Sequence, residues 1–136
     1  MSELTQALTQ ADTYITAAEG FLKLQFDGAR SDKRRNEIAA LAEIVSDAGI
    51  QVTRATAAAK AQSTPSANHL DNMEASAGSL NLCLFLFQEI RKVVPHDGES
   101  DVAIHSFSNI GIRIAEAAEA AAWDAAASME KEANDE

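Results

Sequence analysis

Leu80-Asn81-Leu82-Cys83-Leu84-Phe85-Leu86-Phe87 is the stretch that decides the fold, since nowhere else do large apolar residues run almost unbroken. It lies in the middle of residues 65–94, where the apolar spacing predicts one helix at 100° per residue. One side of this helix forms a core stripe with alternating steps of three and four. The stripe consists of Leu70, Met73, Ala77, Leu80, Leu84, Phe87 and Val94.

A second apolar ridge lies on roughly the opposite side of the same helix and consists of Leu82, Leu86, Ile90 and Val93. Either the helix is the most buried member of a monomeric bundle, or this ridge is the interface of a two-fold homodimer. A membrane span is disfavoured, because the uninterrupted run of residues 82–87 is far shorter than the roughly 20 residues that a bilayer requires. Cys83 lies between the ridges and is expected to pack in the core.

The same spacing predicts three further helices, which end near residues 26, 62 and 129. Gly28 is expected to stop the first of them in the left-handed conformation. The expected N-caps of all four helices are Ser2, Ser31 or Asp32, Thr64 and Ser100. The expected core stripes are Leu4, Leu8, Ala11, Ile15, Ala18, Leu22 and Phe26 in the first helix; Ile38, Leu41, Val45, Ala48, Val52, Ala55 and Ala59 in the second; and Ala103, Phe107, Ile110, Ile114, Ala118, Ala121, Ala125 and Met129 in the fourth.

Helices of similar length with short connections predict an all-α protein, an antiparallel up-down-up-down four-helix bundle. The alternative is two helical hairpins completed by dimerisation. Residues 1–129 are expected to form a single helical domain, and residues 130–136 an acidic, frayed tail.

The formal net charge is −10, and it is unevenly distributed. Residues 97–136 carry ten acidic and two basic side chains, whereas residues 1–96 carry eleven and nine. This balance argues against nucleic-acid binding, which depends on Lys and Arg. It fits an acidic protein that either stays soluble through its charge or meets a basic partner. The first residues lack a secretory signal, so the expected compartment is the cytoplasm.

One basic cluster breaks the acidic pattern and consists of Arg30, Lys33, Arg34 and Arg35. In an up-down bundle the first and third connections lie at the same end, which brings Asp97, Glu99 and Asp101 close to it. Mutual charge compensation therefore explains the cluster, and an anion or nucleic-acid site is the alternative.

Catalytic and metal-binding patterns are missing from the sequence. No Glu-x-x-His pair, Gly-x-Ser-x-Gly elbow or Gly-rich phosphate loop occurs, and the three histidines are not spaced as ligands. We therefore expect no enzyme, no cofactor and no metal site.

Trp123 is the residue that the predicted core does not explain. It lies about 160° from Phe107 around the fourth helix, on the side that also carries His105, Ile112, Glu116 and Glu119. One hypothesis is that Trp123 tucks against a neighbouring helix. The other is a partner-binding surface with an apolar anchor and an acidic rim.

The sequence thus favours a small acidic protein-binding module that docks on a basic partner through its fourth helix. Inhibitors, immunity proteins and anti-defence factors are of this type. The alternatives are a structural oligomer or scaffold subunit, and a helical bundle that binds a ligand where Ala residues leave space between helices.

Overall fold

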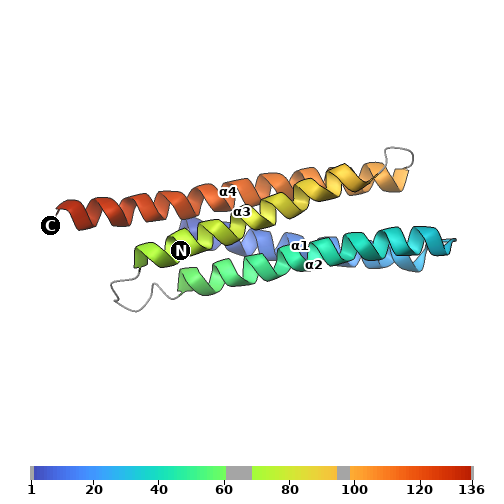
Figure 1. The fold of residues 1–136 in the computed structure, drawn as a ribbon, viewed down its shortest axis with the longest axis horizontal. Helices are drawn as coiled ribbons and strands as arrows, with labels where there is room; N and C mark the ends of the chain where they lie inside the picture. The colour runs from blue at the N-terminus through green and yellow to red at the C-terminus, as the bar shows by residue number, and fades with distance from the viewer. Residues whose placement is uncertain (1, 61–68, 95–98, 136) are drawn as a thin grey trace.

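The computed structural model describes residues 2–60, 69–94 and 99–135, and the regular elements in these ranges are all α-helices. They are α1 (Glu3–Asp27), α2 (Asp32–Lys60), α3 (His69–Val93) and α4 (Glu99–Asp135). The helices lie antiparallel in an elongated bundle, and both chain ends lie at the same end of it (Figure 1). α4 continues as a helix past Met129, where the frayed tail was expected to begin.

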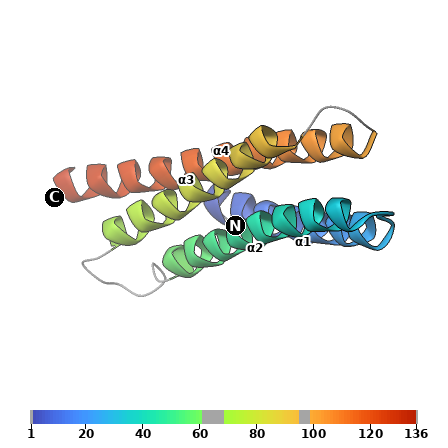
Figure 2. The same cartoon turned by 45° about the vertical axis from the view of Figure 1, so that its right-hand side comes forward.

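Each helix packs against two neighbours. The backbone of α1 approaches those of α2 and α4, and the backbone of α3 approaches those of α2 and α4. Across the diagonal, the Tyr14 ring of α1 meets the Phe87 ring of α3 edge to face, with centroids 5.4 Å apart. Figure 2 shows the α1–α2 hairpin as one layer and the α3–α4 hairpin as the other. The predicted up-down-up-down four-helix bundle is therefore confirmed.

Two of the predicted caps are confirmed. Ser2 Oγ accepts a hydrogen bond from the backbone N–H of Thr5, and Ser31 Oγ accepts one from Arg34, each at 3.1 Å. The cap predicted at Ser100 is wrong, because α4 already begins at Glu99. The cap predicted at Thr64 lies outside the described residues.

The helix stop predicted at Gly28 is confirmed, because α1 ends at Asp27 with Gly28 as its C-cap, but the left-handed conformation expected there is wrong. Gly28 has φ −89° and ψ −3°, which are right-handed values that other residues adopt as well. Its N–H continues the helical pattern by donating to Leu24 O at 3.1 Å. The chain therefore leaves α1 without a backbone conformation that requires glycine.

The core stripe of α2 is confirmed from Ile38 through Ala55. In α1 the predicted residues are buried from Leu4 to Leu22, and Tyr14 joins them. Phe26, in contrast, is 40% exposed. It lies in the last turn of α1, beside a groove where α2 presents the small side chains of Ala39 and Ala42 and does not cover the ring.

α4 is rotated relative to the prediction. Ile110, expected in the core, is 48% exposed, whereas the predicted residues Ala118 and Ala121 are buried. The buried side also includes residues outside the predicted stripe, namely Ile104, Ser108, Gly111, Ala115, Ala122 and Ala126. Gly111 is part of the cause: a Cβ built there would lie 2.8 Å from Tyr14 Cε1 and 3.0 Å from Phe87 Cδ1. α4 therefore packs against its neighbours through glycine and serine as well as through apolar residues. A prediction based on apolar spacing alone does not include these two residue types.

Side-chain hydrogen bonds to backbone carbonyls join neighbouring helices along their buried seams. They run from Tyr14 Oη to Phe107 O, from Ser76 Oγ to Ala55 O at 3.0 Å, from Ser108 Oγ to Phe87 O at 2.9 Å, and from His105 Nε2 to Val94 O at 2.9 Å. Each bond satisfies a polar group that packing has removed from water, and it also fixes the register of two helices.

Cys83 packs in the core, as predicted, and is 1% exposed. Burial raises the pKa of its thiol to about 12, because the thiolate would lie among apolar side chains. Burial likewise raises the pKa of the Tyr14 hydroxyl.

Candidate functional site

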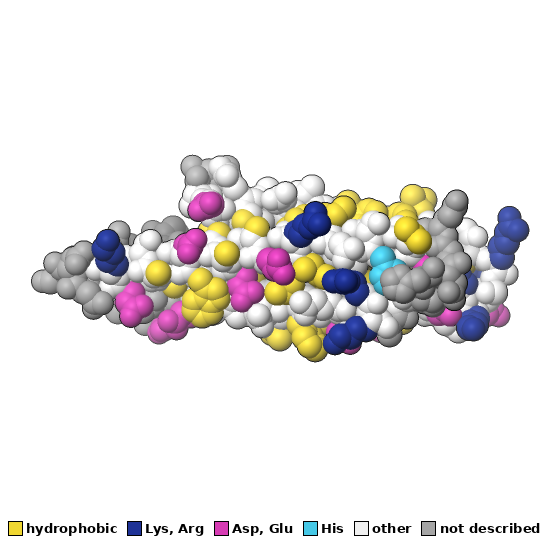
Figure 3. Space-filling model, turned by 90° about the horizontal axis from the view of Figure 1, so that it is seen from above, with side chains coloured by type: hydrophobic (Ala, Val, Ile, Leu, Met, Phe, Trp, Pro, Cys, Tyr) yellow, Lys and Arg dark blue, Asp and Glu magenta, His cyan; other side chains and the backbone are white. Residues whose placement is uncertain are grey.

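The face formed by α4 and α3 separates charge along its length. Acidic side chains gather on its left half in Figure 3, with hydrophobic side chains between them, and Lys and Arg side chains lie mainly towards the right. Among the described side chains, the exposed acids of α4 from its middle onward are Glu116, Asp124 and Glu130, and those of the first turns of α3 are Asp71 and Glu74. The acidic part of this face therefore lies at the end of the bundle where α3 begins and α4 ends.

Trp123 lies within this acidic region and is 48% exposed. Glu116 precedes it by two turns of the same helix and is exposed as well. Glu119 lies one turn before Trp123 and is partly buried, because its carboxylate accepts hydrogen bonds from Asn81 Nδ2 at 3.2 and 3.4 Å. An apolar ring and oriented carboxylates thus share one surface.

Small residues on α3 explain why Trp123 stays half-exposed. The Asn81–Glu119 bond shows which turns of the antiparallel helices lie level. One turn further towards the end of α4, Trp123 comes level with Gly78 and its neighbours on α3. A Cβ at Gly78 would meet nothing within 4 Å, so α3 leaves open space on this side.

His105 and Ile112, which were expected on the outer face with Trp123, are buried, at 9% and 8% exposure. Their side of α4 faces α3 over most of its length, as the His105–Val94 contact shows. The prediction of an outward orientation is therefore wrong for these two residues. The predicted orientation is wrong because α4 is rotated about its axis relative to the prediction. In addition, α3 covers this side of α4 around His105 and Ile112 but leaves Trp123 half-exposed.

The predicted ridge on α3 does not form a continuous exposed surface. Leu82 is 52% exposed, but Leu86 is partly buried against the core and Ile90 is 4% exposed. The Val93 side chain lies outside the described residues. Phe85, which belonged to neither predicted ridge, is 53% exposed, and the Lys92 ammonium lies 5.9 Å from its ring centroid.

The predicted charge compensation of the basic cluster is confirmed for Asp101, whereas Asp97 and the Glu99 side chain lie outside the described residues. Arg34 Nη1 lies 2.9 Å from Asp101 Oδ1 and 3.3 Å from Glu37 Oε2. Asp101 Oδ1 receives no aligned hydrogen bond from the described residues, so charge attraction alone stabilises that contact. Arg35 pairs with Asp32 at 2.7 Å.

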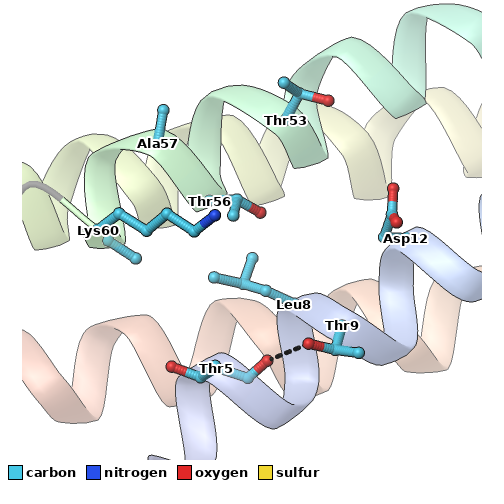
Figure 4. Close-up of a pocket in the computed structure, with 9 residues that line it drawn as sticks. Thr5, Leu8, Thr9, Asp12, Thr53, Thr56, Ala57 and Lys60 are labelled. Atoms are coloured by element: carbon cyan, nitrogen blue, oxygen red, sulfur yellow. Dashed lines mark hydrogen bonds between the residues drawn. The ribbon is translucent and has the colours of Figure 1, made fainter.

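An open groove of about 850 Å³ lies between α1 and α2 (Figure 4). It is lined by Thr5, Leu8, Thr9, Asp12, Thr53, Thr56, Ala57, Ala59 and Lys60. The hydroxyls of Thr9, Thr53 and Thr56 donate to carbonyls of their own helices at 2.8–3.0 Å. These hydroxyls can therefore offer only their lone pairs to a ligand, around an apolar floor at Leu8.

Within the bundle, a void of about 20 Å³ lies between Tyr14, Phe87 and Phe107. This is room for about one water molecule. No three His, Cys, Asp or Glu side chains among the described residues come together as metal ligands. The helices of the described ranges are also too short or too polar to span a bilayer.

Comparisons with protein-family models, with curated proteins and with solved structures found no match. A function for this chain therefore has to be inferred from its own side chains, because the four-helix bundle serves many unrelated functions.

Proposed function

We propose that this protein is a binding module that docks on a basic surface of a partner protein through the outer side of α4. Trp123 is the apolar anchor, and Glu116, Glu119 and Asp124 form the acidic rim. The observation that supports this most directly is the 48% exposure of Trp123 among carboxylates. An inhibitor, an immunity protein or an anti-defence factor of the cytoplasm would act in this way.

The physical chemistry of interfaces supports these roles. Tryptophan is enriched among the residues that dominate binding energy, since one ring buries a large apolar area with little loss of side-chain freedom. Rim carboxylates accelerate association with a cationic partner and orient it. Glu119 is already held by Asn81, so binding would cost little further ordering of that side chain.

The proposed surface differs from the sequence hypothesis in its membership. His105 and Ile112 are omitted because they are buried, and Asp124 is added because it is exposed beside Trp123. The acids Asp71 and Glu74 of α3 extend the rim across the neighbouring helix.

The test is affinity capture from host lysate with immobilised wild type, Trp123→Ala and Phe85→Ala. Phe85 is the matched control, since it is an aromatic residue of similar exposure (53%) on α3. We expect a basic protein that wild type and the Phe85 variant retain, that the Trp123 variant loses, and that salt elutes. Unchanged retention by Trp123→Ala, with its helical circular dichroism intact, would refute the proposal.

A second measurement addresses the rim alone. Once the captured partner is purified, Glu116→Gln combined with Asp124→Asn should lower the association rate and flatten its salt dependence. A rate that is indifferent to both salt and these substitutions would remove the electrostatic part of the proposal.

An assembly or scaffold subunit is the second candidate. The exposure of Leu82 and Phe85 on α3 favours it, because large apolar side chains on neighbouring turns mark interaction surfaces. Capture of further copies of this chain, and of no other protein, would support that candidate over the first.

A further inference from the structure

Trp123 is the only tryptophan of the chain, and its ring has no cation of the chain beside it. Phe85 of α3 is exposed to a similar extent, but the Lys92 ammonium lies 5.9 Å from its ring centroid. A cation in this position is attracted by the negative face of the aromatic ring. Among the described residues, no Lys or Arg takes the corresponding place over Trp123. The half-exposed indole is therefore open to a cation that another molecule brings.

The turns of α3 and α4 beside Trp123 carry carboxylates and no base. Residues 69–90 of α3 and residues 114–130 of α4 contain no Lys or Arg. The exposed carboxylates on the facing turns are those of Glu74, Glu116, Asp124 and Glu130. Carboxylates gathered in this way make the local potential negative and attract cations. Neither stretch supplies the counter-charge, so a cationic group of a partner has to supply it.

The carboxylate of Glu119 has a fixed orientation next to the ring. Both of its oxygens lie within hydrogen-bonding distance of Asn81 Nδ2, at 3.2 and 3.4 Å. Glu119 precedes Trp123 by four residues, so the two side chains are neighbours on one side of α4. A carboxylate has about four lone-pair sites, so its oxygens can accept further hydrogen bonds beside the one from Asn81. An aromatic face and an oriented acceptor with two oxygens thus lie side by side before a partner binds.

Position 78 of α3 leaves room beside this pair. The Asn81–Glu119 bond crosses the seam, so Gly78, about one turn nearer the start of α3, lies level with the turn of Trp123. A Cβ built on Gly78 would meet nothing within 4 Å. A flat group lying along the indole ring would therefore not collide with a side chain at position 78.

We infer that this site receives an arginine side chain of the partner, whose guanidinium group stacks on Trp123 and donates to the two oxygens of Glu119. The inference rests on the proposed function, since it names the group of the partner that the Trp123 surface binds. The other carboxylates attract the arginine side chain through the negative potential and do not have to contact it.

The chemistry of the site selects guanidinium over ammonium. Guanidinium is planar and weakly hydrated, and its N–H donors form a fork that matches the two oxygens of a carboxylate. It therefore stacks on the ring of Trp123 and bonds to Glu119 at the same time. A lysine ammonium is a compact, strongly hydrated charge without this fork, so it gains mainly from the negative potential. A metal ion is disfavoured, because no three His, Cys, Asp or Glu side chains of the described residues come together as ligands.

The first test is a fluorescence titration of the purified protein with two peptides, acetyl-tri-arginine amide and acetyl-tri-lysine amide. The two peptides carry the same charge, and Trp123 is the only tryptophan, so its emission reports this site directly. We expect tri-arginine to bind with a dissociation constant at least about threefold lower than that of tri-lysine. Equal or reversed dissociation constants, or no change in tryptophan emission with either peptide, would overturn the inference.

The second test removes the acceptor. Glu119→Gln should reduce the preference for tri-arginine over tri-lysine, because it removes the carboxylate that the guanidinium fork requires. Glu43→Gln is the matched control, since it removes the same charge at an exposed position of α2 and should leave the preference intact. Equal preferences in the two variants, with helical circular dichroism unchanged, would overturn the assigned role of Glu119.

The inference and the proposed function fail in different ways. Capture from lysate with Trp123→Ala measures whether this surface binds a partner, whatever kind of cation the partner presents. If that variant loses its partner and the two peptides bind equally, the proposed function stands and the arginine inference is wrong. If Trp123→Ala retains the partner, the proposed function is wrong whatever the peptides show.

Discussion

Ser108 Oγ donates a hydrogen bond to the carbonyl oxygen of Phe87 at a distance of 2.9 Å, across the seam between α3 and α4. Ser108 is 1% exposed, so neither partner can turn to water instead. The bond explains how a serine takes a central place among apolar side chains. It is also one reason why α4 presents a different side to the core than its apolar pattern predicts.

Ser108→Ala should lower the free energy of unfolding by about 1 kcal/mol, because the substitution removes a buried hydrogen bond. Ser46→Ala on the exposed side of α2 should change it by less than about 0.5 kcal/mol. Urea titration followed by circular dichroism measures both values. Equal stability of the two variants would mean that the buried bond contributes nothing.

Gly111→Ala should destabilise the bundle by about 1–3 kcal/mol, because the new methyl group would overlap Tyr14 and Phe87. The same change at Gly78, where a Cβ meets nothing, should stabilise α3 by about 0.5–1 kcal/mol. Thermal unfolding of the two variants therefore shifts in opposite directions. A stabilising effect of Gly111→Ala would show that α3 and α4 do not approach this closely.

Stability should fall as the pH rises from about 9 to about 12. The pKa of Cys83 is raised from 9.0 to about 12 by burial, so the folded protein holds this proton more tightly than the unfolded chain. The corresponding stabilisation is fully present below pH 9 and is lost as the pH rises, by about 1.4 kcal/mol per pH unit. Cys83→Ala should reduce this slope in denaturation curves measured at successive pH values.

The Arg34–Asp101 pair should show a measurable coupling energy. Their side chains are 25% and 11% exposed, so we expect about 0.5–1 kcal/mol in a double-mutant cycle, decreasing with salt. The Arg35–Asp32 pair, in which the Asp32 side chain is 96% exposed, should give less than about 0.5 kcal/mol. Equal coupling in both pairs would show that partial burial does not strengthen the first.

The fold could be predicted because the decisive information was apolar spacing. The α2 stripe from Ile38 to Ala55 consists almost entirely of residues that burial favours, so the sequence and the structure agree on it. In α4 the buried side includes Ser108 and Gly111, whose reasons for burial are a bond and a close approach to other helices. Neither reason can be read from α4 alone.

The candidate site was predicted only in part, because its exposure also depends on contacts between helices that the pattern of α4 alone does not show. Placing Trp123 opposite Phe107 assumed that Phe107 points to the centre of the core. Phe107 instead faces α1, stacked on Phe21, so the opposite side of α4 faces α3 and buries His105 and Ile112. Trp123 is exposed because the facing turns of α3 carry small residues, and no single-helix pattern shows which turns face each other.

The order in which the helices touch has a consequence for the path of folding. α1–α2, α2–α3 and α3–α4 join helices that follow one another in the chain, whereas α1–α4 brings its two ends together. The entropic cost of bringing distant parts of the chain together therefore falls mainly on the α1–α4 contact, where Tyr14 bonds to Phe107. The three sequential seams can form rapidly from local contacts. The chain is thus expected to collapse first as an open row of helices, and to cross its main barrier when the first helix meets the last.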